Sequence, residues 1–85
     1  MKVISTDRID SSIEVHRNRI ILPQKVTITC GDTTVKAYTA TIFDVEDLGD
    51  VNVCSLDDYY RTIDGALTVA KLNIDLAIAI YEARI

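Results

Sequence analysis

The C-terminal third of the chain constrains the fold most, because from Leu56 to the last residue it contains no proline and only one glycine, Gly65. An uninterrupted stretch of this length favours one long helix over several short elements. Ser55 stands directly before it and is followed by acidic residues, which is typical of a helix N-cap and first turn. We therefore predict a helix over about residues 56–84.

Helical periodicity sorts the side chains of this predicted helix into one polar and two apolar stripes. The first apolar stripe runs the whole length and should pack on the rest of the chain; it consists of Leu56, Tyr60, Ile63, Leu67, Ile74, Ile78, Tyr81 and Ile85. The second, which we call the outer stripe, consists of Val69, Leu72, Leu76, Ile80 and Ala83. A helix on a sheet needs only one buried face, so the outer stripe predicts an interface with a second copy, in a homodimer or higher oligomer.

The C-terminal segment also fits a strand. Hydrophobic residues occupy the even positions of residues 72–80 with polar or small residues between them, which is the period-two pattern of a strand. Three alanines favour a helix instead, and residues 71–73 contain no glycine or proline that would turn the chain. The single helix is the favoured prediction, and a helix over 56–70 followed by a strand over 74–82 is the alternative.

The clearest strand signal is a hairpin centred on Gly31 and Asp32. Glycine at the first of these positions suits a two-residue type II′ turn. The cross-strand pairs in that register are Cys30 with Thr33, Ile28 with Val35, and Val26 with Ala37. These pairs form an apolar face and leave a threonine-rich face opposite, so we expect the apolar face to be the covered one.

Short alternating runs with turn signals extend over about residues 11–54, which we predict to form three to five short antiparallel strands. With the C-terminal helix they give an α+β fold, in which a small antiparallel sheet packs against one long helix. The 85 residues are predicted to form a single domain, and 48% of them are hydrophobic. A chain of this size buries only a moderate core, so oligomerisation would stabilise it substantially.

The net charge of −4 is unevenly distributed. Residues 1–40 carry six basic and four acidic side chains, whereas residues 41–85 carry three basic and nine acidic ones. Nucleic-acid binding depends on basic side chains that neutralise phosphates, so a nucleic-acid partner is not expected. The acidic half suits a basic protein partner or simple solubility.

The residue types that carry most chemistry are scarce. His16 is the only histidine, and Cys30 and Cys54 have no CxxC spacing, so we expect no metal site, no cofactor and no catalytic residue. The cysteines are predicted to be buried free thiols, with one disulfide as the alternative. No secretory signal and no apolar run of about 18 residues is visible, which predicts a cytoplasmic protein without a membrane span.

Two small clusters have the composition of recognition sites. Tyrosine and arginine supply many interface hot spots, and the candidate contact residues are Tyr59, Tyr60, Arg61, Arg17, Arg19 and Arg84. The favoured hypothesis is a non-catalytic protein-interaction module that self-associates through the C-terminal helix and acts as a small acidic inhibitor or adaptor on a larger partner. The alternative is a binder of a small anionic or nucleotide-like ligand, with its site at a subunit boundary.

Overall fold

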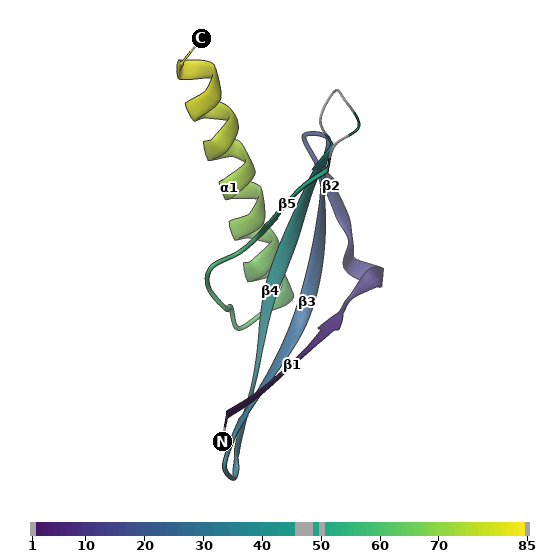
Figure 1. Cartoon of the computed structure of the whole chain (residues 1–85), viewed down its shortest axis with the longest axis vertical. Coiled ribbons are helices and arrows are strands. Elements are labelled where there is room, and N and C mark those ends of the chain that lie inside the picture. Colours follow the sequence, from purple (N-terminus) through teal and green to yellow (C-terminus); the bar gives the residue numbers. More distant parts are fainter. Residues whose placement is uncertain (1, 46–48, 50, 85) are drawn as a thin grey trace.

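The computed structural model describes residues 2–45, 49 and 51–84, and it confirms the predicted α+β fold. Five antiparallel strands form one sheet, and a single α-helix follows them at the C-terminus (Figure 1). The elements are β1 (Lys2–Arg8), the short 3₁₀ helix η1 (Asp10–Ser12), β2 (Glu14–His16), β3 (Arg19–Cys30), β4 (Thr33–Val45), β5 (Val51–Ser55) and α1 (Ile63–Ala83).

The long hairpin of β3 and β4 forms the middle of the sheet. The strands pair without interruption from Arg19 opposite Asp44 to Cys30 opposite Thr33, as the predicted register requires. Gly31 has a φ of 61°, which a glycine adopts without strain at the first position of this turn. The strand order is β1-β3-β4-β5, and β2 pairs with β3 on the same edge as β1.

The strand β1 lies outside the region that was predicted to form strands. It pairs along its whole length with the second half of β3, from Lys2 opposite Cys30 to Arg8 opposite Gln24. Its sequence, KVISTDR, has no apolar alternation, and all seven of its side chains are exposed. It is a strand because it pairs with β3, which is remote in the chain.

The helix α1 covers only one half of the hairpin. Figure 1 shows it beside the half that is joined to β2 and β5, while the half that ends in the turn projects beyond it. The core between the two layers is formed by Ile21, Ala40 and Ile42 from the sheet and by Leu67, Ala70 and Ile74 from α1. The molecule is elongated as a result, with extents of 52 × 24 × 22 Å.

The helix lies on the opposite face of the hairpin from the one predicted. Side chains alternate between faces along a strand, so Ile21 shares its face with Lys25, Thr27 and Thr29. That face was interpreted as the threonine-rich, uncovered one. The prediction about the position of α1 was wrong because it rested on the half of the hairpin that α1 does not reach. There the apolar face is covered in part, since Val26 and Ala37 are buried and Val35 is exposed.

The helix begins seven residues later than predicted. Thr62 is the N-cap, and its Oγ1 accepts a hydrogen bond of 3.0 Å from the backbone N–H of Gly65. Ser55, predicted as the cap, is the last residue of β5. The segment between them follows the edge of β4, where Tyr38 and Tyr60 exchange two backbone hydrogen bonds of 2.7 Å. These bonds satisfy backbone groups that β5 leaves open, so tertiary pairing outweighs helix propensity here.

Beyond this start, α1 is continuous to Ala83, so the alternative with a strand over residues 74–82 is wrong.

Candidate functional site

One flank of α1, which we call the polar flank, is held against β2 and the turn after it by Lys71 and Asp75. Lys71 Nζ lies 2.7 Å from an oxygen of Glu14. The Asp75 carboxylate lies 2.9 Å from Nε2 of His16 and 3.2 Å from Arg17. These partly exposed pairs orient the helix on the sheet and contribute modestly to stability.

The turn between β2 and β3 places the basic partners of Asp75. Arg17 and Asn18 both have positive φ values, 50° and 68°, as a two-residue type I′ turn requires. The tight turn brings His16 and Arg17 to the same carboxylate. Their hydrogen bonds, the one with His16 most strongly, hold the pKa of Asp75 below its ordinary value of 3.8.

The outer stripe lies beyond the polar flank, on the side of α1 that faces away from the sheet. Leu72 and Leu76 are each 60% exposed and Ile80 is 45% exposed. Ala83 is also exposed, and Val69 is half-buried. The predicted interface residues are therefore large apolar side chains that remain in contact with solvent.

The first apolar stripe is covered only in part. Leu67 and Ile74 are buried and Ile78 is half-buried, as predicted, but Tyr81 is exposed. Tyr81 was assigned to the chain's own sheet. It lies near the C-terminal end of α1, which extends past the core.

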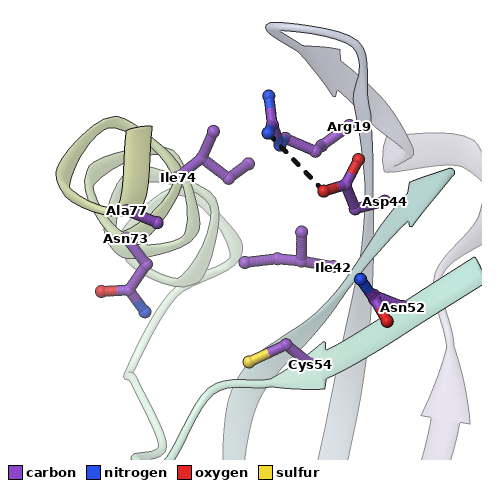
Figure 2. A pocket seen from close by; sticks show the side chains of 8 residues that line it. All are labelled: Arg19, Ile42, Asp44, Asn52, Cys54, Asn73, Ile74 and Ala77. Atoms are coloured by element: carbon purple, nitrogen blue, oxygen red, sulfur yellow. Dashed lines mark ion pairs between the residues drawn. The ribbon is translucent and has the colours of Figure 1, made fainter. Parts of the chain in front are cut away.

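A cavity lies between the strand β5 and one side of α1. Asn73 and Ala77 of α1 and Asn52 and Cys54 of β5 line one cavity of about 210 Å³. Figure 2 shows Cys54 pointing toward the helix, with Ile42 and Ile74 between the two elements. The other residues that line it are Arg19 and Asp44, an ion pair at 3.5 Å.

The cavity shows that the side of α1 with Asn73 and Ala77 faces β5. On a helix, continuing round from Asn73 leads to Ile80, Leu76 and Leu72 across the side that faces away from the sheet, and then to the polar flank. Ile80 is therefore the large outer-stripe residue nearest the β5 side, and Leu72 lies next to the polar flank.

The sheet face opposite α1 carries an apolar row that sequence reasoning missed. Val15, Ile20, Phe43 and Val53 are consecutive cross-strand partners on β2, β3, β4 and β5. Val15 is 70% exposed and Val53 is 60% exposed. Each residue sits in an alternating run, but only the register across four strands shows that they form one row.

The predicted contact residues lie in three separate places. Arg17 and Arg19 are at the β2–β3 turn, where each pairs with an aspartate. Tyr59 is half exposed, Tyr60 pairs with Tyr38, and Arg61 is exposed, all before the start of α1. Arg84 is the C-cap, roughly 30 Å along the helix axis from Arg61. The structure does not bring these groups together in one subunit.

Both cysteines are free and exposed, so the prediction of buried thiols was wrong. Within residues 2–45, 49 and 51–84, no three metal-ligating side chains of the His, Cys, Asp or Glu type are grouped so as to hold an ion. In the same part of the chain, no helix has the length and apolar character needed to cross a membrane.

Neither a model of a protein family, nor a curated protein, nor a solved structure matches this chain.

Proposed function

We propose that this protein is a non-catalytic interaction module that self-associates through the outer stripe of α1. The observation that carries the proposal is the exposure of Leu72, Leu76 and Ile80 on a helix whose opposite side already packs on the sheet. Large apolar side chains grouped on one exposed surface are typical of a protein–protein interface.

The total surface supports a second copy as the partner. The chain exposes 6132 Å², whereas a compact protein of 9.4 kDa exposes about 5,000 Å². Its radius of gyration is 14.7 Å, against about 12 Å for a compact chain of 85 residues. The excess of roughly 1,100 Å² exceeds the ~800 Å² that each partner buries in a standard interface.

The test is the mass in solution of the native chain and of a double variant, Leu76→Glu with Ile80→Glu. Light scattering after size exclusion should give a multiple of 9.4 kDa for the native chain and 9.4 kDa for the variant. Two glutamates would place charges in an apolar interface without entering the chain's own core. Glu82→Lys, an exposed charge change on the polar side of α1, is the control and should assemble like the native chain.

A native chain that is monomeric at micromolar concentration would contradict the proposal. So would a double variant that assembles normally, because the interface would then lie elsewhere.

The action on a larger partner, as a small acidic inhibitor or adaptor, rests on charge. Asp57, Asp58 and Asp64 are exposed around the start of α1. Glu46, Asp47 and Asp50 belong to the same acidic stretch but lie outside the described residues. A basic protein captured through this surface should be released as salt rises from about 0.1 M to 0.5 M, because screening weakens exposed charge pairs. Salt-independent capture would argue against an electrostatic contact.

The small-ligand alternative has less support, because its arginines and tyrosines lie apart within one subunit. It would require a second subunit to complete the site.

A further inference from the structure

The strand β5 ends the sheet, and the hydrogen bonds nearby show which of its backbone groups face outward. Leu56 N–H donates to the Ala40 carbonyl, and Tyr38 and Tyr60 exchange bonds, so the even-numbered residues of β4 bond toward the β5 side. By the alternation of an antiparallel ladder, Ile42 bonds to Cys54 and Asp44 to Asn52. The N–H and C=O groups of Val51, Val53 and Ser55 therefore point away from β4, and no other described strand pairs with this edge.

This edge lacks the charges and prolines that natural proteins often place on an exposed strand to block pairing. Its sequence, VNVCS, contains neither a charge nor a proline, and all five residues are exposed. The three outward-facing residues are spaced symmetrically about Val53. An antiparallel copy of the same edge therefore complements it, donor to acceptor, at every position.

We propose that β5 pairs antiparallel with β5 of a second copy about a two-fold axis at Val53. Val53 lies opposite Val53 of the second copy, and Val51 lies opposite Ser55 of that copy. About six backbone hydrogen bonds form across the axis. The two sheets become one, and the apolar row of Val15, Ile20, Phe43 and Val53 continues into its own copy on the face opposite α1.

The proposal rests on the self-association put forward above, and it adds a second surface to it. The β5 edge borders the Asn73 side of α1, and Ile80 is the large outer-stripe residue nearest that side round the helix. Val53 on this edge is 60% exposed and Val15 in the apolar row is 70% exposed, so both surfaces are open to a second copy.

The pairing fixes a register that one substitution tests. Asn52 lies opposite Cys54 of the second copy in a non-hydrogen-bonded pair, where Cα atoms are about 4.5 Å apart. That separation is within the range of a disulfide, whereas the two Cys54 residues are separated by about 8 Å and are too distant. In a Cys30→Ser background, Asn52→Cys should form a covalent dimer under mild oxidation, and the background chain alone should not.

A matched pair of prolines tests the hydrogen bonds. Val53→Pro removes an outward N–H at the β5 edge and leaves the bonds to β4 in place. Thr6→Pro does the same at the opposite edge, because the Ile9 N–H bonds to the Pro23 carbonyl and the even residues of β1 therefore face outward. Val53→Pro should raise the dissociation constant of the dimer at least about 100-fold, while Thr6→Pro changes it less than about threefold.

The outcomes separate the two proposals. Three results would overturn the β5 pairing. The first is a cross-link through Cys54 in the background chain, and the second is an equal effect of the two prolines on the dimer. The third is a dimer that forms but that Asn52→Cys does not cross-link. Loss of assembly in the Leu76→Glu/Ile80→Glu variant together with normal assembly of Val53→Pro would leave the outer stripe as the interface and reject β5. The opposite result would retain β5 and reject the stripe. Circular dichroism shows whether Val53→Pro is folded; if it is not, the cross-link decides.

Discussion

The polar flank and the outer stripe of α1 belong to one helix but differ in what they contact. On the polar flank, Lys71 and Asp75 pair with β2 and the turn after it. On the side that faces away from the sheet, Leu72 and Leu76 are mostly exposed. A third face, with Leu67, Ala70 and Ile74, is buried against the sheet. The helix thus carries more apolar side chains than its one buried face accommodates, and its outer stripe is available to another molecule.

The largest expected effect compares a core position with an outer-stripe position two residues away. Ile74 is buried against the sheet, so Ile74→Ala should destabilise the monomer by about 2–5 kcal/mol. Leu72→Ala should change it by less than about 0.5 kcal/mol, because Leu72 is exposed. Urea unfolding at a concentration where the chain is monomeric measures both. Equal losses would mean that the core face and the outer stripe of α1 are not distinct within one chain.

A smaller effect tests where α1, which carries both the polar flank and the outer stripe, begins. Thr62 accepts a hydrogen bond from the Gly65 N–H, so Thr62→Ala should cost about 1 kcal/mol of stability. Ser55→Ala is the control, because Ser55 lies in β5 and caps no helix. Thermal unfolding followed by circular dichroism at 222 nm compares them. A larger loss for Ser55→Ala would support the earlier helix start.

The smallest expected effect concerns the polar flank itself. Asp75→Asn should lower the melting temperature slightly at pH 7, because it removes the charge that faces His16 and Arg17. The pKa of this carboxyl is lower in the folded chain than its ordinary value of 3.8. Its contribution is therefore present above that value and is lost as the pH falls through the folded-state pKa.

Melting curves of the native chain and Asp75→Asn should accordingly differ at pH 7 and converge at the lowest pH at which both still fold. A difference that does not change with pH would show that the charge of Asp75 does not hold the polar flank.

Features that depend on neighbouring residues were predictable from the sequence. The turn at Gly31 and the alternation on either side of it determine the register of β3 and β4, because a two-residue turn leaves one pairing. Helical periodicity separated Ile74 from Leu72 correctly, since three or four residues make one turn whatever the helix packs against. The candidate interface on α1 was found in this way.

Features that depend on remote contacts were not predictable. The segment of β1 has no apolar alternation, and only its ladder with β3 makes it a strand. The residues between Ser55 and Thr62 have acidic side chains suited to a helix start, but the open edge of β4 binds their backbone instead. The apolar row through Phe43 requires the register of four strands at once.

Turn chemistry and the periods of helix and strand are local, so the α+β class, the hairpin, the single long helix and the outer stripe on it follow from the order of the residues. Three features depend instead on contacts between remote residues: the sheet face that α1 covers, the residue at which α1 starts, and the apolar row across four strands. Backbone groups and side chains far apart in the chain compete for the same partners, and no local pattern records which of them prevails.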